Sequence, residues 1–342
     1  RMACLEFRVY AVLNRLKAEL RTMSTTFAHH FKVDGVVGWA MPTVHQSNWR
    51  HAMVTSGRFR TYAAAFALAL AIISTAPAKY SGGTGEPNDP YQIATAADLI
   101  ALGEEPNDCD KHFLLTADID LDPNLPGRKV FDRAVIAPDT NDAPSSWFEG
   151  TAFTGVFDGN GHTISHLTIT GGSYLGLFGQ LVGWGSGAEV KDLGMADVNI
   201  TGTGRCVGGL VGYCDVGTVT GCYSSGSVSG ADFVGGLVGS NDGSIVACHS
   251  SASVSGEDFA GGLAGANGGL GGGLMARCCS TGSVSGKNYV GGLVGSNNSG
   301  SIVMSYSTGS VTGEDTVGGL VGDNSGYGDI VMSYSTGSVT GE

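Results

Sequence analysis

Short apolar runs alternate with glycine and small polar residues throughout the second half of the chain. Residues 301–313 read SIVMSYSTGSVTG and residues 329–341 read DIVMSYSTGSVTG, so the runs IVMSY and SVTG recur, and VGGLVG recurs between them. A period of two over a few residues, bounded by Gly, Asn, Ser and Asp, is typical of short β-strands and not of helices. The pattern therefore predicts strands joined by tight turns.

The same unit returns at a nearly constant interval. Blocks reading GGLVG, or once GGLAG, place a leucine after two glycines, with steps of 27, 26, 30 and 27 residues between successive leucines. These leucines are Leu210, Leu237, Leu263, Leu293 and Leu320. An interval of this size is the sequence signature of stacked repeats. With three short strands in each unit of roughly 27 residues, the chain is predicted to be all-β, a right-handed parallel β-solenoid.

Stacking explains the composition of the repeat. Successive coils of a β-solenoid lie about 4.8 Å apart, so the same position in neighbouring repeats forms a column of like residues. Leucine and valine columns fill a narrow core, and the 57 glycines of the chain supply its corners. Degenerate copies of the leucine block place Leu177, and before it Phe157, in the leucine column. Counting these copies predicts about seven coils.

The segment before the repeats is predicted to cap the first coil. Residues 91–93 favour a strand, and Thr95 can N-cap a short helix that ends near Gly103. Residues 113–121 favour a second strand, and residues 122–149, rich in Pro, Asp and Asn, are expected to loop out. A cap is needed because an open solenoid end offers unpaired backbone groups to other chains.

The chain resembles a known family in these motifs. The G-L-x-G tetrads, the tail CYSSGSVSG from Cys222, and the lead-in ADIDLD followed by FTGVFDGNGHTISHLTI resemble the GLUG-repeat proteins of bacterial surfaces, over roughly residues 80–342. The resemblance implies a secreted, repetitive, adhesin-like or scaffold role, sometimes as an appendage to a peptidase. It supplies no catalytic residue.

Charge divides the chain in two. Residues 1–78 contain nine Lys or Arg against three acidic residues, whereas residues 79–342 contain nine against 28, a net charge of −19. An acidic repeat surface repels nucleic acid and anionic membranes. We therefore expect no nucleic-acid partner.

An export signal is predicted within the basic part. Arg58 and Arg60 precede an apolar stretch at 63–73, which is followed by the small-residue motif APA at 76–78. That stretch is too short for a comfortable membrane span, so none is expected in the mature chain, which would be secreted or at the cell surface. The expected parts are an upstream or non-native extension (1–52), a signal peptide (53–78), a cap and loop (79–150), and a repeat solenoid truncated at its C-terminus (151–342).

Three carboxylates alternate along the end of the second predicted strand. Asp118, Asp120 and Asp122 would share one face, and with Asn124 they could hold a hard cation such as Ca²⁺. The alternative is a solvated strand face, because the glycine and the distal glutamate of a calcium loop are missing. Calcium is the only cofactor that the sequence suggests.

A second candidate lies in the stretch FDGNGHTI. Asp158 and His162, with Asn160 between them, could act as acid and base in an enzyme that degrades polysaccharides. However, D-G-N-G is also a turn sequence that supplies residues with positive φ. The turn is the favoured interpretation, so no catalytic residue is assigned.

Cysteines recur within the repeats. One column, predicted to point inward, contains Cys222, Cys248, Cys278, Ser305 and Ser333. The neighbouring column, predicted to point outward, contains Tyr223, His249, Cys279, Tyr306 and Tyr334. Buried thiols are favoured, and Cys206 with Cys214 is the best-suited pair if any disulfide forms.

Pairs of hydroxyl residues flank an inward valine in each repeat. They are Ser227 and Ser229, Ser253 and Ser255, Ser283 and Ser285, Ser310 and Thr312, and Ser338 and Thr340. Such columns could meet the hydroxyls of an extracellular glycan or another cell-surface partner, and an ordinary solvated strand face is the alternative.

Regularity favours a scaffold over an enzyme. The later repeats are nearly identical, and no cluster of Asp, Lys and Arg recurs across adjacent coils. We therefore expect a non-enzymatic extracellular or cell-surface repeat scaffold that binds glycans or surfaces, with any catalytic module beyond Glu342. The alternative function is a polysaccharide-degrading β-helix enzyme, either a lyase or a glycoside hydrolase.

Overall fold

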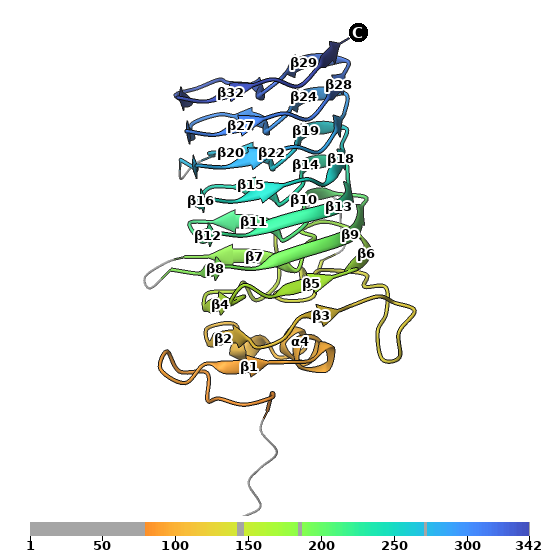
Figure 1. The fold of residues 1–342 in the computed structure, drawn as a ribbon, viewed down its shortest axis with the longest axis vertical. Helices are drawn as coiled ribbons and strands as arrows, with labels where there is room; N and C mark the ends of the chain where they lie inside the picture. Colours follow the sequence, from red (N-terminus) through yellow and green to blue (C-terminus); the bar gives the residue numbers. More distant parts are fainter. Residues whose placement is uncertain (1–78, 142–146, 184–186, 270–271, 342) are drawn as a thin grey trace, which may run out of the picture. The chain divides into compact units, whose positions relative to one another are not determined.

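The computed structural model describes residues 79–141, 147–183, 187–269 and 272–341. Within these residues the strands stack in parallel into a solenoid of about six turns (Figure 1). The predicted all-β parallel solenoid is confirmed. The expected extension at 1–52 and signal peptide at 53–78 lie outside the described residues.

Strands of the described part form four parallel sheets, here named A to D. Sheet A contains β1 (Tyr91–Ile93), β2 (His112–Leu115), β4 (Val156–Asp158), β8 (Glu189–Lys191), β12 (Thr218–Thr220), β16 (Ser244–Val246), β21 (Leu274–Ala276), β26 (Ser301–Val303) and β31 (Asp329–Val331). Sheet B contains β10 (Arg205–Gly208), β14 (Asp232–Gly235), β19 (Asp258–Gly261), β24 (Asn288–Gly291) and β29 (Asp315–Gly318).

The other two sheets complete each coil. Sheet C contains β7 (Phe178–Val182), β11 (Val211–Asp215), β15 (Val238–Asn241), β20 (Ala264–Asn267), β25 (Val294–Asn297) and β30 (Val321–Asp323). Sheet D contains β3 (Ile119–Asp120), β5 (Thr163–Ser165), β6 (Thr168–Gly171), β9 (Gly194–Gly202), β13 (Tyr223–Ser229), β17 (His249–Ser250), β18 (Ser253–Ser255), β22 (Cys279–Ser280), β23 (Val284–Ser285), β27 (Tyr306–Ser307), β28 (Val311–Gly313), β32 (Tyr334–Ser335) and β33 (Val339–Gly341).

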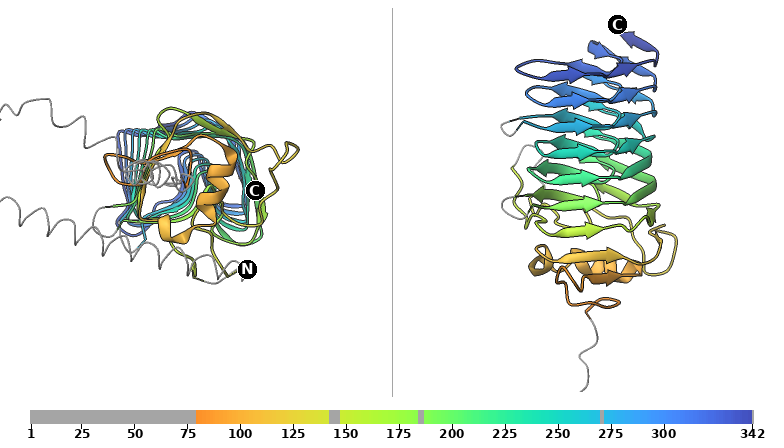
Figure 2. Two further views of the ribbon diagram at one scale, coloured as in Figure 1. Left: turned by 90° about the horizontal axis from the view of Figure 1, so that it is seen from below. Right: turned by 60° about the vertical axis from the view of Figure 1, so that its left-hand side comes forward.

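Each coil has more sides than the sequence pattern predicts. The run AGGLAG, expected to form a single strand, is divided between β19 and β20, and Gly262 and Leu263 turn the corner between these strands. A second corner lies at Ala247, whose φ of 53° is left-handed. Viewed down its axis the solenoid is four-sided (Figure 2). The prediction of three strands per coil is wrong because a glycine pair bends the chain where the apolar alternation continues unbroken.

The leucine column runs along the inside of the stack. Leu177, Leu210, Leu237, Leu263 and Leu293 are fully buried, and Leu320 in the last coil is partly buried. The amide of Leu237 donates to the carbonyl of Leu263 at 3.0 Å, and the amide of Leu263 donates to the carbonyl of Leu293 at 2.9 Å. Phe157 does not belong to this column, because it pairs in register with Val190 on sheet A. The prediction of seven coils therefore placed Phe157 in the leucine column, although this residue lies on a different side of the solenoid.

Packing explains the glycines of the repeated block. A Cβ on Gly261 would lie 1.9 Å from the carbonyl oxygen of Ala264, and one on Gly262 would lie 2.0 Å from Oγ of Ser280. A Cβ on Gly265 would lie 2.4 Å from the carbonyl carbon of Phe233 in the preceding coil. All three positions exclude a side chain because backbone or buried side-chain atoms already occupy the space.

A buried ladder of asparagine side chains runs along the inside of sheet C. Nδ2 of Asn241 donates to Oδ1 of Asn267 at 2.8 Å, and the pattern repeats from Asn267 to Asn297 at 2.8 Å and from Asn297 to Asn324 at 2.7 Å. The first three of these side chains are fully buried. The ladder was missed from the sequence, although the recurring Ser-Asn after GLVG could have indicated it. Because each amide pairs with the next, the ladder satisfies buried polar groups inside the core.

The predicted cap helix is confirmed. Helix α4 (Ala96–Gly103) begins at Thr95, whose hydroxyl accepts from the amide of Asp98 at 3.2 Å, while the Asp98 carboxylate accepts from the amide of Thr95 at 3.0 Å. It lies across the first coil, and a short 3-10 turn, η1 (Pro106–Asp108), follows.

The loop predicted at 122–149 packs more closely than expected. Ile136 is fully buried, and it forms a bridge to Phe178 on sheet C. The strand expected at 113–121 is interrupted, since only β2 and β3 form there. The apolar residues of this loop thus extend the core, which composition alone does not reveal.

Candidate functional site

The predicted hydroxyl columns lie on the outer face of sheet D. Ser227 pairs in register with Ser253, and Ser255 pairs with Ser285, which pairs with Thr312. Between the two columns the valines of each coil point inward, as Val254 and Val284 do. The exposed members are Ser227, Ser253, Ser255, Ser283, Ser285, Ser310, Thr312, Ser338 and Thr340, whereas Ser229 is half-buried. Strand geometry sets the lattice at about 4.8 Å between coils and about 7 Å along a strand.

A third hydroxyl column on the same face was missed from the sequence. Its exposed members are Ser251, Thr281, Thr308 and Thr336. The amides of Thr281 and Thr308 donate to the carbonyls of Ser250 and Ser280 in the preceding coils, so these positions stack like the others. They lie two residues before Ser253, Ser283 and Ser310. The alternation of polar with small or apolar residues through SASVS and TGSVS could have indicated this third column.

The hydroxyl face, defined by these three columns from residue 251 to residue 312, keeps free hydrogen-bonding capacity. Within the described residues, some hydroxyls bond the protein, as Ser285 Oγ does to the carbonyl of Val254 at 3.3 Å. The hydroxyls of Ser255, Thr308 and Thr312 form no such bond to any part of the chain that the structure describes. A flat array of exposed donors and acceptors can bind a polymer that carries hydroxyl groups at a similar spacing.

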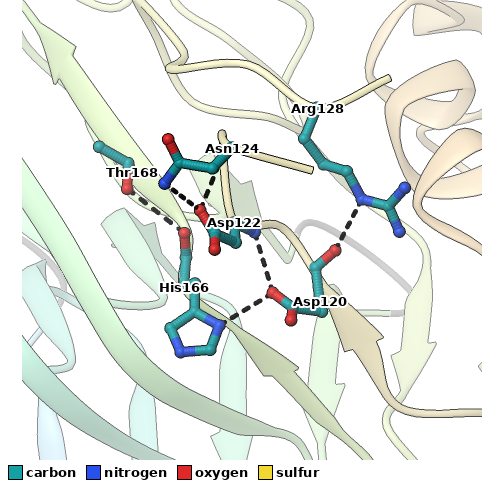
Figure 3. A network of polar contacts seen from close by, with 6 residues as sticks. All are labelled: Asp120, Asp122, Asn124, Arg128, His166 and Thr168. Atoms are coloured by element: carbon teal, nitrogen blue, oxygen red, sulfur yellow. Dashed lines mark hydrogen bonds and ion pairs between the residues drawn. The ribbon is translucent and has the colours of Figure 1, made fainter. Parts of the chain in front are cut away.

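The three alternating aspartates do not converge on one point. Asp118 Oδ1 lies 3.1 Å from Nδ1 of His162, and Asp120 Oδ1 lies 2.9 Å from Nδ1 of His166. Asp122 instead accepts from the amide and the side chain of Asn124, at 2.9 and 2.8 Å. Figure 3 shows the Asp120 and Asp122 part of this network. Among the described residues no group of three or more His, Cys, Asp or Glu is arranged to hold a metal ion, so the geometry does not support the calcium site.

These aspartates instead join the cap to the first repeat coil. Asp120 is on β3 and His166 follows β5, and these two strands pair in parallel. The hydrogen bond with Asp120 raises the pKa of His166, with smaller contributions from the carboxylates of Asp122 and Asp197. The amide of Asp122, and then His166, lower the pKa of Asp120. Both side chains are solvent-exposed, so the pair is a weak joint.

This joint predicts a pH dependence at the cap. A histidine with a raised pKa stabilises the fold below its unfolded pKa of about 6.5, and that contribution is lost as the pH rises through the folded pKa. Raising the pH from about 5 to about 8 is therefore expected to lower the hydrogen-exchange protection factors of the β3 and β5 amides. His166→Gln should remove this pH response, and His249→Gln, an exposed histidine in the repeats, should keep it. An unchanged response in His166→Gln would show that the pair is not the joint.

The second candidate forms a turn. Asp158 Oδ1 accepts from the amide of Asn160 at 2.8 Å, and Asn160 and Gly161 have φ of 52° and 77°. Asp158 also lies 3.6 Å from Nζ of Lys191, whereas His162 pairs with Asp118. The structure thus gives Asp158 and His162 different partners and does not bring them together as an acid and base pair.

The inward cysteine column forms a buried ladder. The amide of Cys222 donates to Sγ of Cys248 at 3.4 Å, and the amide of Cys278 donates to Oγ of Ser305 at 3.1 Å. Burial raises the pKa of the Cys278 thiol to about 12, so this thiol stays protonated and unreactive. All seven described cysteines are free, and Cys206 and Cys214 form no disulfide. The neighbouring column, which contains Tyr223 and His249, points outward, and the rings of these two residues stack with their centroids 5.1 Å apart.

Comparison with known proteins identifies the repeat. The family model described as "The GLUG motif" matches residues 286–312, a segment that contains β24 to β27. This segment of the chain is a GLUG repeat. The other GGL blocks occupy equivalent positions in the stack, so the same motif builds the neighbouring coils of this GLUG solenoid.

Two relatives share part of the GLUG solenoid. Halomucin of Haloquadratum walsbyi is 32% identical over 234 residues, 68% of this chain, and a candidate Gly-rich membrane protein of Evansella cellulosilytica is 34% identical over 146 residues, 39% of this chain. The chain spans only 2% and 14% of those two proteins. No helix among the described residues has the length and apolar character needed to cross a bilayer.

A solved structure shares the fold. A candidate immunoglobulin A1 protease from Bacteroides ovatus superposes with a TM-score of 0.53 at 20% sequence identity, covering 77% of this chain and 87% of that chain. At this identity the likeness establishes the architecture and says nothing about activity.

Proposed function

We propose that this GLUG solenoid is an extracellular or cell-surface scaffold whose hydroxyl face binds glycans. The observation that carries the proposal is the register of sheet D, which repeats the same exposed hydroxyls coil after coil. A lattice with a fixed spacing suits a repeating polymer better than a single small molecule. One of the similar proteins is named Halomucin and another is named as a Gly-rich membrane protein, which supports a surface location.

The fold supports the scaffold part of the proposal. Each coil is held to the next by parallel strand pairing, by the leucine column and by the asparagine ladder, so the stack resists bending between coils. A rigid stack can hold a flat face at a distance from its attachment point. This is the mechanical requirement of a spacer that presents a binding surface.

The hydroxyl face predicts a binding loss on mutation. Combining Ser253→Ala, Ser283→Ala and Ser310→Ala should weaken binding to the best-retained polysaccharide by about tenfold or more, because each hydrogen bond contributes about 0.5 to 1.5 kcal/mol. A glycan array and affinity gels with soluble polysaccharides would measure this. Folding should be unaffected, since the three side chains are exposed.

A matched control tests the position of the face. Ser244→Ala with Ser301→Ala removes hydroxyls from sheet A, and it should leave polysaccharide binding within about twofold of the unmodified protein. Equal losses in both variants would show that the hydroxyl face is not the binding surface. Failure of the unmodified protein to retain any glycan would remove the proposal.

A further inference from the structure

A ladder of aromatic rings runs along the outside of sheet B. Phe233 stacks on Phe259 with ring centroids 4.8 Å apart, and Phe259 stacks on Tyr289 at 4.7 Å, both pairs tilted by only 4°. The three side chains are partly exposed, and all three residues have left-handed backbones with φ of 54° to 56°. Because each ring covers the face of the next, a ligand can reach a ring face only at an end of the ladder.

An arginine of the chain itself covers the first end. The guanidinium carbon of Arg205 lies 5.3 Å from the ring centroid of Phe233 and 5.8 Å from that of Trp147. Arg205 pairs in register with Asp232, so a carboxylate accompanies the cation. The ladder therefore already binds one guanidinium by cation–π contact.

The opposite end, at Tyr289, has no such cation among the described residues. Val290 pairs with Val317, which places Thr316 where the next ring would stand. Thr316 keeps the left-handed backbone, with φ of 55°, although a β-branched residue rarely adopts it. The backbone of the ladder thus continues into this coil while the ring column stops, and only a short side chain faces Tyr289.

Negative charge gathers around the Tyr289 end. Asp315 and Glu314 are exposed, and neither takes part in an ion pair within the described part of the chain. The nearby Lys287 is paired with Glu257 at 3.2 Å. Further along the ladder, burial and then the charge of Asp258 raise the pKa of Asp232. A cation is the complementary ligand.

We propose that the Tyr289 end of the aromatic ladder binds the guanidinium of an arginine side chain from a partner protein. The guanidinium would lie on the ring of Tyr289 as Arg205 lies on Phe233, with Asp315 as its counter-ion. An arginine fits better than a lysine because its flat group stacks on an aromatic face. This site is on sheet B and is independent of the hydroxyl face on sheet D.

The test is a titration of the whole chain with the peptide acetyl-Gly-Arg-Gly-amide by calorimetry at physiological salt. The matched peptide with citrulline, which has the same shape and no charge, should bind at least about tenfold more weakly. Asp315→Asn and Tyr289→Leu should each weaken binding by about threefold to tenfold. Thermal melting of each variant checks folding, and Asp315→Asn carries the test if Tyr289→Leu fails to fold.

A charge-matched control separates the site from general attraction to an acidic protein. Asp329→Asn removes one exposed carboxylate from the same coil on sheet A, and it should leave binding within about twofold. Equal losses for Asp315→Asn and Asp329→Asn, or equal binding of the citrulline peptide, would overturn the proposal. Loss of glycan binding in the sheet D variants would not affect this result.

Discussion

Leu263→Asp is expected to unfold the coils on both sides of the substitution. Leu263 is fully buried, and its backbone is bonded to Leu237 and Leu293 in the neighbouring coils. Replacing a buried leucine by a smaller residue costs about 2 to 5 kcal/mol, and an unpaired charge in the same place adds to that cost. Limited proteolysis and hydrogen exchange should show new cleavage and lost protection within the flanking coils first, because each repeat contacts only its neighbours.

A control in the same coil isolates the effect of burial. Ser255→Asp places the same charge on the exposed face of sheet D, and its proteolysis pattern should match that of the unmodified protein. If Leu263→Asp also left the pattern unchanged, the leucine column could not be the core of the solenoid.

Gly262→Ala is expected to destabilise the solenoid by about 2 to 3 kcal/mol, an overpacking cost, although only one methyl group is added. The new Cβ would lie 2.0 Å from Oγ of Ser280 and 2.3 Å from the carbonyl oxygen of Gly292. The first atom belongs to a side chain that could move, but the second is backbone in the next coil. Thermal or denaturant unfolding would measure the loss.

The control for this prediction is a glycine with open space around it. A Cβ on Gly161 meets nothing within 4 Å, although its φ of 77° is left-handed. Gly161→Ala should therefore cost only the strain of that conformation, about 1 kcal/mol. A loss in Gly262→Ala no larger than that in Gly161→Ala would show that crowding does not explain the glycine pair. Adding Ser280→Gly to Gly262→Ala should recover part of the stability, because it removes the hydroxyl that the new Cβ meets. The recovery should be incomplete, because the Gly292 carbonyl remains in place.

The repeat period predicts those features that depend on position alone. Leu237, Leu263 and Leu293 align because equal spacing along the chain becomes vertical stacking in the solenoid, and the inward valines and outward serines follow from the strand alternation. The direction of the cysteine column was predictable for the same reason, since Cys222 and Cys248 alternate with outward Tyr223 and His249.

Features that depend on where the chain turns were harder to predict. The alternation of apolar and polar residues does not predict the corner at Gly262, because the leucine after this glycine continues the apolar pattern. Bulky residues such as Phe259 and Tyr289 rarely adopt a left-handed φ, so the sequence did not predict the backbone conformation that forms the aromatic ladder. Asp118 and Asp120 were expected to share a ligand, but their histidine partners come from the following coil, more than 40 residues away. Long-range pairing of this kind has no local signal.

The asparagine ladder has a direction that bears on how such a chain can change in length. The side-chain nitrogens of Asn241, Asn267 and Asn297 each donate to the asparagine of the following coil, so Asn267 and Asn297 each accept one bond within the ladder and supply one. An in-frame duplication of one whole unit adds a donor and an acceptor together, and leaves no amide unpaired. Loss of a partial unit would leave a buried polar group without its partner. Changes in length by whole coils are therefore compatible with the ladder, whereas fractional changes break it.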